Sequence, residues 1–118
     1  MRGNRNTDVL QHIVDYCNEI NSTIERFGND YEIFSKDSVY RNAVALCVLQ
    51  IGELTTKFTE DFKNIYNGIP WNQIKALRNV VAHNYGKIDK EILWETILND
   101  IPQLQKYCEE IVKQLEVM

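Results

Sequence analysis

The sequence predicts an all-α fold, a bundle of four to five helices that run up and down. Apolar residues recur at steps of three and four along most of the 118 residues, which is the spacing of one helix face. Capping residues, glycines and prolines interrupt this pattern at intervals typical of short helix connections. No segment combines strand-like alternation with the turn chemistry of a hairpin. We expect one helical domain over residues 1–118, because this length supports a single apolar core.

The first helix is expected to begin after Asn6 or Thr7, either of which can cap it, and to end at Gly28-Asn29. Its buried stripe consists of Leu10, Ile13, Cys17, Ile20, Ile24 and Phe27. Residues 30–36 are expected to form a short connector. Its apolar residues, available to cover the core, are Tyr31, Ile33 and Phe34.

The second helix is expected to begin near Asp37 or Ser38 and is apolar on nearly every side between residues 43 and 51. A helix that is apolar all round is buried all round, so it needs a second helical layer, with a partner subunit as a further candidate cover. Gly52 permits the close approach of another backbone, or a bend. The apolar pattern then resumes with Leu54, Phe58, Phe62 and Ile65, and stops at residues 67–70.

Pro70 fits an early position of the third main helix, which Tyr85-Gly86 is expected to close. Asp89 can cap a short fourth helix. Residues 99–102 are expected to interrupt the helical pattern before a final helix begins. The inward residues of the fourth helix are expected to be Ile92, Leu93, Ile97 and Leu98. Those of the last are Leu104, Cys108, Ile111, Val112 and Leu115.

Composition narrows the function classes. A net charge of −4 and a pI near 5.1 argue against a protein that coats nucleic acid through overall charge, so any such site must be a local positive pocket. Cys17, Cys47 and Cys108 are far apart on helical patterns, which predicts buried free thiols. The N-terminus leads into no apolar signal core, and the apolar stretch 43–51 is too short for a bilayer. We expect a cytoplasmic protein without a membrane partner.

Residues 78–85, Arg-Asn-Val-Val-Ala-His-Asn-Tyr, concentrate the candidate chemistry. With Arg78 at zero on a helical wheel, Lys75 lies at about 60°, Asn79 at about 100° and His83 at about 140°, while Tyr85 lies about 20° to the other side. Asn72 joins this polar face at about 120°. The opposite flank carries Ile74, Leu77, Val80 and Val81. The helix is therefore expected to anchor by an aliphatic face and to present a cationic face that suits phosphate chemistry.

Each site residue also has a simpler interpretation. A lone histidine such as His83 is more often a cap or a packing residue than a catalyst. Arg78 can bind phosphate oxygens through its planar fork, or form a salt bridge for which Glu53 is a natural candidate. The two histidines lie on different helices without a metal-binding spacing, so we expect no metal site and no cofactor.

Residues 78–85 match the Arg-x4-His-x-Tyr motif of HEPN domains, and the chain resembles in particular the HepT-like toxins encoded beside minimal nucleotidyltransferases. The resemblance covers nearly the whole chain. It includes residues 43–53, which end in Gln-Ile-Gly-Glu, the lead-in 69–71, Trp94 and residues 99–104. One departure is that residues 86–89 lack the aromatic residue that many relatives carry there.

This resemblance implies a homodimer that cleaves RNA without metal at a cleft between two motif helices. Arg78 and His83 would be catalytic, with Asn79 and Lys75 supporting the phosphate. Tyr85 would accept adenylyl groups from the cognate minimal nucleotidyltransferase, which acts as the antitoxin. Without the resemblance, Tyr85 would be read as a helix cap that packs on Trp71.

Two other functions fit the same pattern. A non-catalytic helical adaptor that binds a nucleotide or the nucleotidyltransferase is favoured by the acidic pI. It is disfavoured by the presence of both Arg78 and His83, since an adaptor needs no proton-transfer group. A bundle without any site would leave the polar face of the third main helix unexplained.

Overall fold

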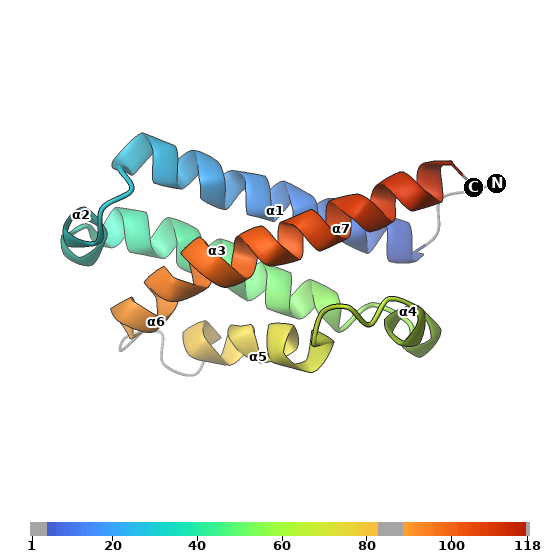
Figure 1. The fold of residues 1–118 in the computed structure, drawn as a ribbon. Helices are drawn as coiled ribbons and strands as arrows, with labels where there is room; N and C mark the ends of the chain where they lie inside the picture. Colours follow the sequence, from blue (N-terminus) through green and yellow to red (C-terminus); the bar gives the residue numbers. More distant parts are fainter. Residues whose placement is uncertain (1–4, 83–88, 118) are drawn as a thin grey trace.

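A computed structural model describes residues 5–82 and 89–117, and every regular element within these ranges is helical. Four long helices alternate in direction: α1 (Arg5–Phe27), α3 (Ser38–Thr55), α5 (Trp71–Ala82) and α7 (Ile101–Glu116) (Figure 1). The short helices α2 (Tyr31–Lys36) and α6 (Lys90–Glu95) lie at one end of the bundle, and α4 (Glu60–Ile65) lies at the other. The prediction of an all-α up-down bundle is confirmed.

Helix α1 ends as predicted but begins differently. Gly28 follows its last residue with a φ of 117°, a left-handed conformation that favours glycine. The predicted N-cap is wrong, because the helix already includes Arg5 and Asn6. The side-chain oxygen of Asn6 instead accepts from the backbone N–H of Thr59 at 3.2 Å. Asn6 thus connects α1 to the residue that caps α4.

The expected connector over residues 30–36 is a helix, α2. Asp30 caps it, since its side chain accepts from the backbone N–H groups of Glu32 and Ile33. The segment is short enough to suggest a connector, but capping by Asp30 is sufficient for it to form a helix. Phe34 is completely buried, as expected for a residue that covers the core, whereas Ile33 is exposed.

Helix α3 is the central helix, packed against both α1 and α5. Its buried residues between positions 43 and 51 are Val44, Ala45, Cys47, Val48 and Ile51. The predicted second helical layer is α5. The expectation of burial on every side is wrong for Leu46 in the single chain, because this side chain is 55% exposed. Helices α1 and α5 leave one stripe of α3 uncovered.

The apolar pattern over residues 54–65 spans two helices rather than one. Helix α3 ends at Thr55, and α4 begins after Thr59, whose hydroxyl accepts from the backbone N–H of Phe62 at 3.2 Å. Phe58 and Phe62 are buried and stack with ring centroids 4.4 Å apart. Ile65, which continues the pattern in the sequence, is exposed.

The sequence suggested that residues 99–102 would interrupt the helical path before the last helix, and this prediction is wrong. A π-helical turn, Thr96–Asp100, connects α6 directly to α7. Proline has no N–H to donate and its ring crowds the carbonyl four residues earlier, so Pro102 marks a helix end in the sequence. The wider π turn accommodates it within a continuous helical path. Ile92 was expected to face inward and is exposed, because α6 buries the side that carries Leu93.

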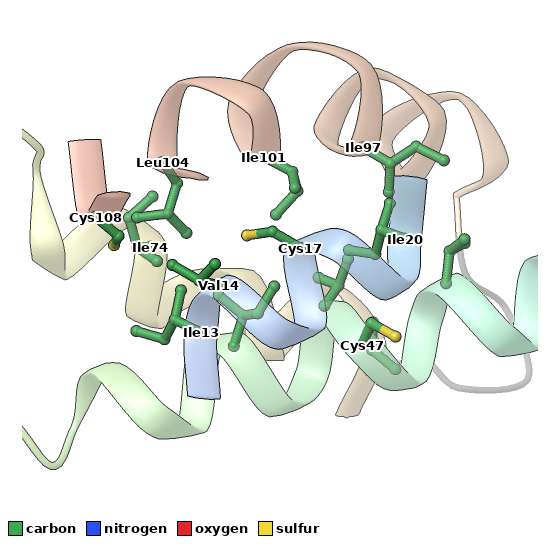
Figure 2. Packing of buried hydrophobic residues seen from close by; sticks show 14 of the residues in the cluster. Ile13, Val14, Cys17, Ile20, Cys47, Ile74, Ile97, Ile101, Leu104 and Cys108 are labelled. Carbon is green, nitrogen blue, oxygen red and sulfur yellow. The ribbon is translucent and has the colours of Figure 1, made fainter. Parts of the chain in front are cut away.

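The core lies where the long helices meet. Figure 2 shows side chains of α1, among them Ile13, Cys17 and Ile20, between those of α3 and α7. The three cysteines are buried and free, as predicted. Burial raises the pKa of the Cys17 and Cys47 thiols to about 12, so both stay protonated and unreactive near neutrality. Among the described residues, no helix is long and apolar enough to span a bilayer.

Candidate functional site

Helix α5 has the two faces that its sequence predicts. Ile74 and Val81 are buried, and Leu77 packs partly buried against the core. The opposite face exposes Asn72 and Asn79 to solvent, together with Lys75. The aliphatic flank is therefore confirmed for the three residues whose side chains the structure describes; the side chain of Val80 lies outside that set.

The polar face of α5 carries a shallow depression of about 240 Å³. The residues that line it are Asn72, Lys75, Ala76, Arg78 and Asn79. Helical spacing predicted that Lys75, Arg78 and Asn79 would share a face, and the structure brings them together. Two cationic side chains and two amides converge there, which are groups that bind phosphate oxygens.

The position of Arg78 depends on a close contact between α3 and α5. A Cβ atom built on Gly52 would lie 3.0 Å from both the Cβ and the backbone nitrogen of Arg78, and 3.3 Å from the carbonyl oxygen of Lys75. A methyl group at this position would force the backbone of α5 to move by a few tenths of an ångström, whereas glycine fits without such a shift. The close approach predicted for Gly52 is thus observed, and its neighbour is the helix that carries the candidate site.

The guanidinium of Arg78 is paired with the next residue of α3. Its Nη1 donates to Oε1 of Glu53 at 2.5 Å, and the two side chains are 34% and 48% exposed. The salt bridge considered from the sequence is therefore present. It uses one of the five N–H donors of the guanidinium, and Arg78 also lines the depression, so further donors remain available to an anion.

His83 and Tyr85, the other predicted site residues, lie outside the described residues. The structure therefore places three of the five: Lys75, Arg78 and Asn79. Sequence reasoning had not selected Asn72 or Ala76 as site residues, although both line the depression. The signal for them was available, because they precede Asn79 by seven and by three positions and so share its face.

Two other features of the structure bear on the location of the site. Within residues 5–82 and 89–117, no group of three or more histidine, cysteine or carboxylate side chains lies close enough to hold a metal ion. A larger groove, about 580 Å³, lies between α1 and α7 and is lined by charged residues such as Lys106, Glu109 and Lys113. Lys75, Arg78 and Asn79 do not line it.

Comparison with known proteins places the chain in a family. Residues 13–111 match the family model HepT-like, described as Ribonuclease HepT-like. The chain belongs to the HepT-like ribonuclease family of the HEPN superfamily. The matched range includes Gly52 and Glu53 as well as the whole of residues 78–85, so the site described above lies within the family domain.

Full-length relatives agree with this assignment. The chain is 34% identical over 106 residues to "Putative RNase TTE0752" of Caldanaerobacter subterraneus subsp. tengcongensis, a match that covers 89% of this chain and 92% of the relative. It is 34% identical over 111 residues to "Putative RNase MJ0127" of Methanocaldococcus jannaschii, covering 92% and 91%. The identity to "Probable ribonuclease HepT" of Thermococcus cleftensis is 32% over 104 residues, covering 84% and 94%. No solved structure matches the chain significantly.

Proposed function

We propose that this chain is a metal-independent endoribonuclease that cleaves RNA at a site containing Arg78 and His83. The observation that carries the proposal is the exposed depression on α5, in which Arg78 lies beside Lys75 and Asn79. It supplies a local cationic site on an acidic protein, as phosphate recognition requires. The family membership supports the same activity, since relatives of similar length are named as ribonucleases.

In the proposed reaction, the imidazole of His83 removes the proton from a ribose 2′-hydroxyl. The 2′-oxygen attacks the adjacent phosphorus, and the bond from phosphorus to the 5′-oxygen breaks. A protonated imidazole, His83 of a second copy of the chain, donates a proton to the leaving 5′-oxygen. The products are a 2′,3′-cyclic phosphate and a 5′-hydroxyl. Imidazole suits both steps because its ordinary pKa of about 6.5 allows it to gain or lose a proton near neutrality.

The residues of α5 would hold the phosphate during this reaction. Arg78 stabilises the negative charge that grows on the phosphate oxygens in the transition state. Asn79 donates a hydrogen bond to the same phosphate, and Lys75 attracts a neighbouring phosphate of the strand. All three positions are solvent-accessible on one face, which an extended strand can follow.

The mechanism needs two copies of the chain, and α3 offers a surface for the contact. Residues 39, 43, 46, 50 and 53 follow one another at steps of four and three along α3, which is one helical stripe. Val39 and Leu46 on this stripe are 63% and 55% exposed, although both are large and apolar. The stripe ends at Glu53, beside Arg78. A homodimer that covers the stripe and places the two Glu53 ends together would bring the two candidate sites near each other.

We also propose that the chain is the toxin of a toxin–antitoxin pair, silenced when a cognate minimal nucleotidyltransferase adenylylates Tyr85. Tyr85 is seven residues after Arg78, which is two helical turns if the helix continues. An adenylyl group on its phenol would add phosphate charge and bulk close to Arg78, and would compete with RNA for the guanidinium.

The nuclease proposal is tested with purified protein and a structured RNA in excess EDTA. We expect cleavage that yields 2′,3′-cyclic phosphate ends, and a loss of at least about a hundredfold in rate for Arg78→Ala and for His83→Ala. Lys113→Ala, which changes an exposed lysine on α7, serves as the matched control. Cleavage at the wild-type rate by both site variants would falsify the proposal.

The regulatory part is tested by coexpression with the cognate nucleotidyltransferase, followed by intact-mass measurement. We expect added mass in multiples of an adenylyl group in the wild type and none in Tyr85→Phe. The modified wild type should lose RNA cleavage. Equal added mass in the Tyr85→Phe variant would show that the modification occurs on another residue.

A second function has one structural observation in its favour. Glu53 partly neutralises Arg78, so the resting site is less cationic than the sequence of α5 suggests. This favours a non-catalytic adaptor that binds the nucleotidyltransferase over one that binds a nucleotide, because a nucleotide is itself an anion. Stoichiometric binding of the cognate nucleotidyltransferase together with the absence of cleavage in the assay above would support the adaptor.

A further inference from the structure

We propose that Glu53 is a positioning residue, whose carboxylate holds the guanidinium of Arg78 in the orientation in which it grips the scissile phosphate. The inference rests on the proposed ribonuclease function and adds a residue to its site. Among the described residues, the Arg78–Glu53 ion pair connects two helices, α3 and α5. The pairs Lys36–Glu32 and Lys63–Glu60 each lie within one helix.

The contact fixes Arg78 at both ends of its side chain. At the backbone end, Gly52 allows the Arg78 nitrogen and Cβ to lie so close to α3 that a methyl group on the glycine would crowd them. The hydroxyl of buried Thr55 donates to the Gly52 carbonyl at 2.8 Å, which stabilises this turn of α3. At the guanidinium end, Glu53 accepts from Nη1. Gly52 and Glu53, which are adjacent on α3, thus set where the backbone of Arg78 lies and how its guanidinium is oriented.

The geometry leaves the guanidinium able to bind substrate. The carboxylate contacts Nη1 through one oxygen, whereas a bidentate pair would occupy two donors. Arg78 at the same time lines the depression that Lys75 and Asn79 share. A long arginine side chain that is free to rotate would lose that freedom when a phosphate binds, and a partner that has already ordered it removes this cost.

A purely structural role explains the pair poorly. Both side chains are partly exposed, and ion pairs in such positions contribute little to folding stability. A negative charge beside a phosphate-binding arginine also opposes anion binding. Loss of the charge should therefore leave RNA affinity unchanged or higher, while loss of the orientation should slow the chemical step. A fall in kcat without a rise in KM therefore distinguishes a positioning role from general damage to the fold.

The test compares Glu53→Ala, Glu53→Gln and the control Glu32→Ala, which removes the exposed Lys36–Glu32 pair on α2. We expect Glu53→Ala to lower kcat by about tenfold to a hundredfold without raising KM, because a small misplacement of a catalytic group costs that much. Glu53→Gln retains an oxygen that can accept from Arg78, so we expect it to recover most of kcat. Glu32→Ala should stay within about twofold of the wild type, and thermal melting should verify that all variants fold.

Two further measurements isolate the action through Arg78. In an Arg78→Lys background, Glu53→Ala should lower kcat by less than about twofold, because interacting residues are not additive. Independently of activity, the Arg78 Nε–H resonance should report a more mobile side chain in Glu53→Ala than in the wild type.

Several outcomes would overturn the proposal. These are wild-type kcat in Glu53→Ala, an equal loss in Glu53→Gln and Glu53→Ala, or a full additional loss in the Arg78→Lys background. An equal loss in the first two variants would mean that the charge or proton of Glu53 matters, rather than its hold on Arg78. Wild-type cleavage by Arg78→Ala would also overturn this inference, and wild-type cleavage by His83→Ala as well would overturn the proposed function.

Discussion

Gly52 and Arg78 lie so close that a Cβ atom on the glycine would stand 3.0 Å from the backbone nitrogen of the arginine. The contact joins α3 and α5 at the residue that begins the motif 78–85. A glycine in the interior of a helix ordinarily costs about 0.5–1 kcal/mol relative to alanine. Here the glycine allows two helix backbones to approach, and this approach places Arg78 beside Glu53.

We therefore predict that Gly52→Ala destabilises the protein, although an uncrowded helical glycine would gain stability from the same change. The methyl group would push α5 away from α3, since a backbone atom cannot move aside as the end of a side chain can. We expect a loss of about 1–3 kcal/mol, typical of overpacking, measured by urea denaturation. RNA cleavage should fall as well, because Arg78 shifts with α5. A gain in stability would mean that the helices are not in contact at this position.

A second prediction concerns Lys75 as a phosphate contact. Lys75→Ala should weaken the binding of an uncleavable 2′-O-methyl RNA and reduce the slope of log affinity against log salt by about 0.7–1, the value for one lost phosphate contact. The measurement is fluorescence anisotropy at several salt concentrations. Lys113→Ala on α7 is the matched control and should keep the wild-type slope. The same slope in all three proteins would exclude Lys75 from the RNA interface.

The sequence predicted the parts of this site that depend on one helix. The spacing of Ile74, Leu77 and Val81 on one side of α5, and of Lys75, Arg78 and Asn79 on the other, follows from 3.6 residues per turn and nothing else. Gly52 likewise indicated a close neighbour. The glycine could not indicate which helix that neighbour would be, because the absence of a side chain permits a close contact without identifying the segment that makes it.

The parts that depend on how helices pack could not be predicted. The sequence offered Glu53 as a partner for Arg78 but could not decide whether the ion pair forms, because that depends on the rotation and height of α5 against α3, which the periodicity of a single helix does not set. Leu46 is a similar case, since its apolar neighbours along the sequence gave no sign that α1 and α5 would leave it exposed. Pro102 led to a wrong prediction because a proline normally marks the end of a helix. Here the π turn before α7 accommodates the proline in a continuous helical path.

A third prediction uses the exposed stripe of α3. Leu46→Lys should convert the proposed homodimer to a monomer, since a lysine at the centre of the stripe would bring like charges together across the contact. Sedimentation equilibrium gives the oligomeric state. Stability of the isolated chain should change by less than about 0.5 kcal/mol, because Leu46 is already mostly solvated.

The control for this dimer test is Ile65→Lys, at an apolar residue on α4 that is 70% exposed and lies outside the stripe. It should leave the oligomeric state unchanged. Persistence of the dimer in Leu46→Lys would place the subunit contact elsewhere, and RNA cleavage by a monomeric Leu46→Lys protein would show that the two-imidazole mechanism is wrong.

The last prediction follows from the buried thiols. Burial raises the pKa of Cys17 from 9.0 to about 12, so above pH 9 the unfolded chain releases a proton that the folded chain keeps. Proton release then favours unfolding, and the stability contributed by the thiol is complete below pH 9 and is lost as the pH rises toward 12. We expect stability to fall between pH 9 and 11 by at most about 1.4 kcal/mol per pH unit for this thiol.

Urea denaturation of the wild type and of Cys17→Ala at several pH values measures this contribution, because the lysine and tyrosine titrations common to both proteins cancel. The alanine variant should be less stable at pH 8 and should lose less on going to pH 11, whereas parallel curves would show that Cys17 titrates in the folded protein as it does in the unfolded chain.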